Sequence, residues 1–358
     1  MFKYIINTIL IMIDKLIDLE KYKGKGLTGL ANLGNTCYLN STMQILSHCY
    51  YFNEFIDNVN IDNLNKLPDS ILFSEWKDLK DMMWNKNCTI APNRFVNCVQ
   101  KIAASKNIEL FSGFAQNDLP EFLMFLFDCF HNSLKRKVNM NIQGDPKNIT
   151  DNLAKECFTM MKNTYTDTYS EILNLFYGIH VSQLHSTTDN KCLSNKPESY
   201  CNINLPIPNS NTCTIYECFD LYTSRELLDG DNAWYDENDK TKKNVYKSIS
   251  FWSFPDILIV DFKRFNNFNK KITTIISTPL TNLDLSKYVI GYDKHSYIYE
   301  LFGVCNHTGG CMGGHYTSYI KNANDKWYHF NDTNINEIDK DKIITNKGYC
   351  YFYRKIIN

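Results

Sequence analysis

The sequence predicts an α+β protein, in which a mainly helical N-terminal part is followed by antiparallel strands. Apolar residues recur at helical spacing as far as about Ile172. From Leu175 onward, short runs of alternating apolar and polar residues are separated by turn residues, which is typical of antiparallel strands. With 358 residues, 44% of them hydrophobic and 22% charged, the chain is long enough for a large core and too apolar to be disordered.

The first segment of the chain is apolar from residue 4 to residue 13. This run is about half as long as a membrane span, and no small-residue cleavage site follows it. We therefore expect an amphipathic helix over residues 2–22 that docks on the core or on a partner. Contact with a membrane surface is the less favoured alternative. Residues 1–24 form this N-terminal extension, and a short basic linker containing glycine separates it from the rest.

A candidate nucleophile lies in the stretch over residues 28–51. Asn35 and Thr36 are suitable helix N-caps, and apolar side chains then recur at helical spacing. Cys37 is thus expected in the first turn of a helix, where the helix dipole and unpaired N–H groups lower the pKa of a thiol. The alternative is a buried structural cysteine. Asn32 lies just upstream, where its side-chain amide and the Cys37 N–H could form an oxyanion hole.

Two long motifs resemble those of a known enzyme family. The run GLANLGNTCYLNSTMQIL around Cys37 resembles the cysteine box of the ubiquitin-specific proteases, which are papain-like cysteine peptidases. The run over residues 313–335 resembles their histidine box. The resemblance implies one catalytic domain over residues 25–358 with a papain-like fold. Its implied parts are a helical thumb over about residues 25–172, β-stranded fingers over about 173–255 and a palm with an antiparallel sheet over about 256–358.

The resemblance also implies a catalytic set. Cys37 would be the nucleophile and His315 the general base and acid, since imidazole titrates in the range that this chemistry needs. Asn331 would orient the imidazole so that its Nε2 faces the sulfur, with Asp332 as the fallback for this role. The alternative for these last two residues is an ordinary polar turn. Asn32 would hold the oxyanion.

A second implied set of residues would bind the C-terminal tail of ubiquitin. The segment over residues 111–134 predicts a helix whose first turn contains Pro120. Position alone makes Asp118 and Glu121 helix-capping residues, whereas the resemblance makes them partners of the arginines in the tail. The glycine-rich stretch over residues 307–314 is expected to be a mobile loop. The implied tail-binding residues are Gln116, Asp118, Glu121, His307, Gly313 and Gly314.

The strand-rich part departs from the family pattern at one point. Many members hold a zinc ion in the fingers with two CxxC pairs, and this chain has no CxxC. Four cysteines in the region, Cys192, Cys201, Cys213 and Cys218, are irregularly spaced. We expect reduced fingers without zinc, and no cofactor. Further on, residues 254–265 predict a strand with Lys263 and Arg264 as its solvated end.

The expected function is that of a thiol-dependent deubiquitinating protease. It would hydrolyse the peptide or isopeptide bond after the C-terminal glycine of ubiquitin through a thioester. An inactive ubiquitin-binding module, and a peptidase for another ubiquitin-like modifier, are the alternatives. The net charge of −1 leaves no basic field for nucleic acid. Thirteen cysteines without a secretion signal favour the cytosol, a host cytosol if the source is viral or parasitic, or the nucleus.

Overall fold

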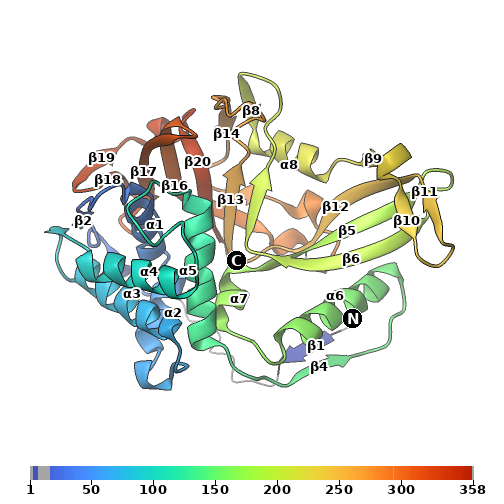
Figure 1. Cartoon of the computed structure of the whole chain (residues 1–358), viewed down its shortest axis with the longest axis horizontal. Coiled ribbons are helices and arrows are strands. Elements are labelled where there is room, and N and C mark those ends of the chain that lie inside the picture. Colours follow the sequence, from blue (N-terminus) through green and yellow to red (C-terminus); the bar gives the residue numbers. More distant parts are fainter. Residues whose placement is uncertain (1–2, 7–16, 293, 357–358) are drawn as a thin grey trace.

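The computed structural model describes residues 3–6, 17–292 and 294–356 (Figure 1). Its helices lie mostly in the first half of the chain and its strands mostly in the second, so the α+β prediction is confirmed. The helices are α1 Cys37–Ser47, α2 Tyr50–Asn58, α3 Pro68–Asn85, α4 Asn93–Ser105, α5 Leu119–Leu134, α6 Ile149–Tyr165, α7 Glu171–Phe176 and α8 Ile215–Thr223.

Helix α1 lies between the N-terminal helices and the large sheet. All of its residues are buried, including polar ones such as Asn40 and Gln44. A helix buried on every side must pack against structure all round, and α1 lies against strand β17 as well as helix α5 (Figure 1). The core around it is built from helix side chains such as Phe52, Trp76 and Phe122 together with Phe352 of the sheet. The cysteine box is therefore held rigidly between the helices and the sheet.

The largest sheet carries the histidine box. Its strands run in the order β19-β18-β17-β16-β20-β13-β7, and β15 pairs with β16. Neighbouring strands are antiparallel except for β13 and β7. The antiparallel strands predicted for this part of the chain are confirmed, among them β16, β17, β18 and β20. The bounds are β7 Asn202–Leu205, β13 Ile257–Phe262, β15 Leu283–Asp284, β16 Ile298–Gly310, β17 Gly313–Lys321, β18 Trp327–Asn331, β19 Asn334–Ile338 and β20 Gly348–Lys355.

A second sheet extends away from helices α1 to α5, on the right of Figure 1. Its order is β6-β5-β12-β9, and α6 packs against β6. Its strands are β5 Gly178–Ser186, β6 Cys192–Tyr200, β9 Glu226–Leu228 and β12 Val245–Ser253. The remaining short pairs are β1 Lys3–Ile6 with β4 Met140–Gln143, β2 Gly29–Leu30 with β3 Thr89–Ile90, β8 Thr212–Thr214 with β14 Ile275–Ser277, and β10 Trp234–Asp236 with β11 Thr241–Lys243.

The helix expected over residues 2–22 is wrong where the structure describes it. Lys3–Ile6 form strand β1, which pairs with β4, and Leu19–Tyr22 form a single 3-10 turn. Residues 2 and 7–16 of the expected helix lie outside the described residues. A short apolar run rich in isoleucine fits a strand as well as a helix, and an available partner strand decides between them. None of the described helices is long and apolar enough to cross a membrane.

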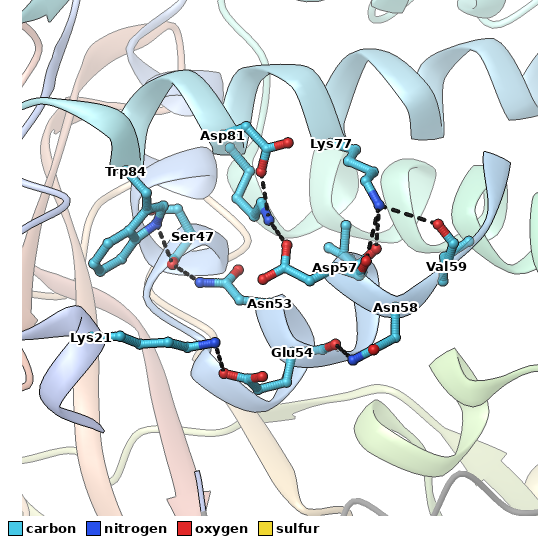
Figure 2. Close-up of polar contacts among 12 residues, drawn as sticks. Lys21, Ser47, Asn53, Glu54, Asp57, Asn58, Val59, Lys77, Asp81 and Trp84 are labelled. Carbon is cyan, nitrogen blue, oxygen red and sulfur yellow. Dashed lines mark hydrogen bonds and ion pairs between the residues drawn. The ribbon is translucent and has the colours of Figure 1, made fainter. Parts of the chain in front are cut away.

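The N-terminal extension docks on the helices through the 3-10 turn. Tyr22 is buried, stacks on Tyr50 with ring centroids 4.5 Å apart and meets Trp84 edge-on at 5.0 Å. Figure 2 shows Lys21 pointing at the carboxylate of Glu54 on α2, with which it forms an ion pair. The expected docking of this extension on the core is thus seen at its C-terminal end.

The prediction that Arg264 is a solvated strand end is wrong. Lys263 is exposed, but Arg264 is only 1% exposed. Its Nε donates to the carbonyl of Gly348 at 2.6 Å, and its Nη1 donates to those of Ile272 and Thr274 at 3.0 and 2.9 Å. Three carbonyl acceptors replace water at Nε and Nη1, which offsets part of the cost of burying the charge, whereas Nη2 is buried without a partner among the described residues. Arg264 ties the loop after β13 to strand β20.

Candidate active site

Cys37 is the first residue of α1, as predicted, and it is only 3% exposed. Thr36 is the N-cap residue, although its side chain makes no capping hydrogen bond to the helix. The backbone N–H of Tyr316 lies close enough to the Cys37 thiol to lower its pKa. Tyr316 follows His315 on β17, so the thiol lies beside the backbone that carries the predicted base. The fold thus brings the two ends of the chain together at this sulfur.

The expected low pKa of Cys37 is wrong for the structure without substrate. Burial raises the pKa of the thiol above its ordinary value, and the carboxylate of Asp332 raises it further. The backbone N–H groups of Tyr316, Tyr38 and Cys37 itself act in the opposite direction without reversing the shift. The sequence indicated the helix N-terminus but not the depth of burial. The resting thiol therefore keeps its proton and needs a base to remove it.

His315 is oriented by Asn331. Its Nε2 lies 2.7 Å from Oδ1 of Asn331, across the neighbouring strands β17 and β18. An amide oxygen only accepts, so Nε2 carries the ring proton and Nδ1 is left to accept the proton of the thiol. The expectation that Nε2 faces the sulfur is therefore wrong. Sequence spacing identifies the orienting residue but does not say which ring nitrogen it contacts.

Asp332 connects the cysteine box to the histidine box. It occupies the turn between β18 and β19 with a positive φ of 49°, which an Asp tolerates. Its Oδ1 accepts from Nδ2 of Asn40 at 2.8 Å, and its Oδ2 accepts from Nδ2 of Asn32 at 3.1 Å. Sequence reasoning missed Asn40. The available signal was the series of polar residues in this helix, of which Asn40 lies closest to Cys37 in the sequence.

Both the oxygen and the nitrogen of the Asn32 side-chain amide are hydrogen-bonded. Its Oδ1 accepts from the backbone N–H groups of Gly34 and Thr36, each at 3.1 Å. One hydrogen of Nδ2 goes to Asp332, and the second hydrogen is used by no hydrogen bond within the described part of the chain. Because Asn32 is exposed, this N–H can reach a bound ligand. The geometry suits an oxyanion donor whose position is set before substrate arrives.

The two carboxylates predicted to bind the tail lie at the start of α5. Asp118 is the N-cap residue and Glu121 is in the first turn. Asp118 accepts a hydrogen bond from the Tyr316 hydroxyl at 2.9 Å. Burial raises the pKa of both carboxyl groups, and the charge of Asp118 adds to the rise at Glu121. Neither is in an ion pair with another described residue, so both are available to a cationic ligand.

Gln116 bridges the two walls of the cleft. Its Oε1 accepts from the backbone N–H of Gly314 at 2.6 Å, and its Nε2 lies 3.4 Å from Oδ1 of Asn35. The expected mobile loop over residues 307–314 is wrong, because β16 and β17 pair as far as Gly310 and Gly313. A Cβ at Gly314 would lie 2.2 Å from Nε2 of His307, so this position admits only glycine.

A cleft of about 260 Å³ lies between the start of α5 and the hairpin of β16 and β17. Phe265 and Tyr349 are among the residues that line it. Five of the six predicted tail-binding residues line this cleft, and Glu121 is the exception. The five are Gln116, Asp118, His307, Gly313 and Gly314.

Comparisons with known proteins point to the same family. Residues 28–353 match the family described as "Ubiquitin carboxyl-terminal hydrolase". The chain is 30% identical over 347 residues to ubiquitin carboxyl-terminal hydrolase Usp2 of Drosophila melanogaster, covering 93% of this chain and 35% of that protein. It is 31% identical over 341 residues to ubiquitin carboxyl-terminal hydrolase 2 of Homo sapiens, covering 92% of this chain and 55% of that protein. The chain thus spans between about a third and about half of these relatives.

The fold also matches a solved structure, that of the SAGA DUB module bound to monoubiquitin. The TM-score is 0.72 at 20% sequence identity, over 97% of this chain and 73% of that one. The predicted papain-like arrangement of helices, sheet and fingers is therefore confirmed at the level of the fold. Since the family match extends over most of its length, this chain belongs to the ubiquitin carboxyl-terminal hydrolase family.

Proposed function

We propose that this chain is a deubiquitinating cysteine protease that hydrolyses the bond after the C-terminal glycine of ubiquitin. One observation carries the proposal. Helix α1, which begins at Cys37, packs against strand β17, which carries His315, and His315 is itself held by Asn331. Nucleophile, base and orienting group in this order are the requirement for thiol catalysis of acyl transfer.

Ubiquitin is the proposed substrate on two grounds. The relatives carry the name ubiquitin carboxyl-terminal hydrolase, and the similar DUB module is bound to monoubiquitin. In this chain, Asp118 and Glu121 are carboxylates without a cationic partner among the described residues. They are suited to the arginines of the ubiquitin tail, since charge-assisted hydrogen bonds to arginine are strong.

The proposed reaction begins when the tail enters the cleft and passes Gly313 and Gly314. The bond between Gln116 and the Gly314 N–H closes this path in the free protein and would open on binding. Cys37 then attacks the terminal carbonyl carbon while its proton passes to Nδ1 of His315. The N–H groups of Cys37 and Asn32 would hold the oxyanion.

The second half of the reaction releases ubiquitin. His315 gives its proton to the departing amine, and the carbon–nitrogen bond breaks to leave a thioester on Cys37. Water then attacks the thioester carbonyl with His315 as base, which frees the carboxylate and restores the thiol. Asn331 holds the imidazolium in place throughout. No step needs a cofactor.

The test is covalent labelling with a ubiquitin that carries an electrophile at its C-terminus. The intact chain should gain the mass of one probe on Cys37, and Cys37→Ala should gain none. An inactive binding module would bind the probe without forming the bond. Parallel turnover of fluorogenic ubiquitin and of fluorogenic ubiquitin-like modifiers then decides the remaining alternative. A faster reaction with a modifier other than ubiquitin would overturn the proposed substrate.

A further inference from the structure

Lys271 lies under the cleft without an anionic partner. It belongs to the loop that follows β13, and its Nζ lies 3.0 Å from Nδ1 of His307 and 2.5 Å from the backbone oxygen of the same residue. In the described part of the chain, no carboxylate forms an ion pair with Lys271. Its charged neighbours are Arg264 and Lys347, which are both cations. Burial and these two charges lower the pKa of Lys271 to about 8.

A half-buried cation among cations is unfavourable unless it makes specific contacts, and both of its contacts here are on His307. The imidazole of His307 is buried, and burial together with the charges of Lys271 and His315 lowers its pKa to about 4. The ring is therefore neutral and carries a single proton. Since the ammonium of Lys271 can only donate, Nδ1 must be the accepting nitrogen. The proton of the ring is then on Nε2.

The direction of this Nε2–H follows from the packing around it. The ring lies against Tyr316, with centroids 4.7 Å apart, and near Tyr349 at 5.7 Å. Nε2 is the atom closest to the position that a Cβ on Gly314 would take. It therefore lies over the face of the hairpin at Gly314, within the cleft through which the substrate tail is proposed to run. His307 is also one of the residues that line the cleft.

We propose that Lys271 is a positioning residue of the substrate cleft. By occupying Nδ1 of His307, it fixes the tautomer in which Nε2–H is a donor toward a backbone carbonyl of an extended peptide at Gly314. The identity of this peptide as the ubiquitin tail rests on the proposed function, whereas the tautomer does not. Arg264 helps to fix the backbone next to Lys271, because its Nη1 donates to the carbonyls of Ile272 and Thr274.

The first test reads the tautomer without any turnover. In protein labelled with ¹⁵N on histidine, the two ring nitrogens of one neutral tautomer give well separated signals, and His307→Gln assigns them by difference. The unchanged chain should show a protonated Nε2 and an accepting Nδ1. Lys271→Met should move both signals toward a mixture of tautomers, and Lys271→Arg should restore them. An unchanged pattern in Lys271→Met would overturn the proposal.

The second test reads the consequence for substrate. With fluorogenic ubiquitin, loss of one well-placed hydrogen bond should raise KM about tenfold in Lys271→Met and leave kcat within about threefold. Lys271→Arg should recover most of the difference. Lys347→Met is the matched control, because it removes a nearby exposed charge and leaves the His307 contacts in place. It should keep the KM of the unchanged chain.

The outcomes separate this inference from the proposed function. If the tautomer changes in Lys271→Met while KM stays constant, the donor role toward substrate is wrong. A fall in kcat alone, with thermal unfolding at a lower temperature, would make Lys271 a purely structural anchor and overturn the proposal. If the unchanged chain does not react with ubiquitin but the tautomer still depends on Lys271, the proposed function fails and the positioning of His307 stands.

Discussion

Nε2 of His315 and Oδ1 of Asn331 are 2.7 Å apart, on adjacent antiparallel strands of the large sheet. Each of the two residues is held by its other neighbouring strand, because His315 pairs with Thr308 of β16 and Asn331 pairs with Asn334 of β19. The orientation of the imidazole is thus set by the sheet, whereas the position of the Cys37 sulfur is set by helix α1. Activity requires these two elements to keep their packing.

Asn331→Ala should lower kcat by about 10²-fold or more, since the imidazole loses the acceptor that fixes its tautomer. Asn331→Asp keeps an acceptor oxygen at this position and should retain much more activity than the alanine variant. Turnover of fluorogenic ubiquitin measures both. An equal loss of kcat in the two variants would mean that the acceptor oxygen at position 331 does not contribute to activity.

Asp332→Asn should change two observables in opposite directions. The carboxylate raises the pKa of Cys37, so its removal should move the midpoint of the pH profile for alkylation by iodoacetamide to lower pH. Ubiquitin turnover should nevertheless fall, because the new amide NH₂ faces the donor of either Asn32 or Asn40. A slower alkylation at neutral pH together with normal turnover would contradict this account of Asp332.

Gly314→Ala should lower kcat/KM for ubiquitin more than about tenfold. The added Cβ would lie 2.2 Å from Nε2 of His307 and 2.5 Å from the carbonyl oxygen of Thr308, so the β16 and β17 pair must shift under the cleft. Gly113→Ala is the control, since a Cβ there meets nothing within 4 Å. If both variants keep full activity, the hairpin adapts freely and the steric argument fails.

The sequence allowed the fold class, the helix start at Cys37 and the strand at His315 to be predicted, because these depend on patterns with a local meaning. Asn35 and Thr36 before a helical pattern place Cys37 at a helix start, whatever the rest of the chain does. The glycines before His315 and the alternation after it likewise indicate a strand. These signals extend over a few residues, which is the range within which sequence patterns determine secondary structure.

What could not be predicted depends on contacts between distant segments. Residues 3–6 form a strand only because β4, far along the chain, supplies a partner. The sequence suggested that Arg264 is solvated, whereas in the fold its guanidinium is buried and donates to three backbone carbonyls. These carbonyls belong to Gly348, Ile272 and Thr274. The pKa of Cys37 is a further case. Burial of the thiol raises its pKa by more than the backbone N–H groups at the start of the helix lower it. Local propensity does not contain this information.

Arg264→Met should destabilise the fold by about 3–5 kcal/mol, because it leaves three carbonyl oxygens in a buried region without their donor. Lys263→Met changes the exposed neighbour and should stay within about 0.5 kcal/mol of the unchanged chain. Urea unfolding followed by tryptophan fluorescence gives both free energies. Similar values for the two variants would show that the carbonyls find water or other donors.

Tyr22→Ala should lower the free energy of unfolding by about 3 kcal/mol, which is typical of removing a buried aromatic side chain. The ring fills the space beside Tyr50 and Trp84, and its hydroxyl donates to Oε1 of Glu54 at 3.0 Å. Tyr22→Phe keeps the ring and removes only this bond, so it should cost about 1 kcal/mol. The difference between the two variants then isolates the contribution of the aromatic packing.

The matched control for this position is Lys23→Ala, one residue further along the same extension. Lys23 is exposed and pairs only with Glu20 among the described residues, so its removal should change stability by less than about 0.5 kcal/mol. Urea unfolding of all three variants tests the docking of the extension directly. If Tyr22→Ala unfolds at the same urea concentration as Lys23→Ala, the 3-10 turn is not bound to the helices in solution.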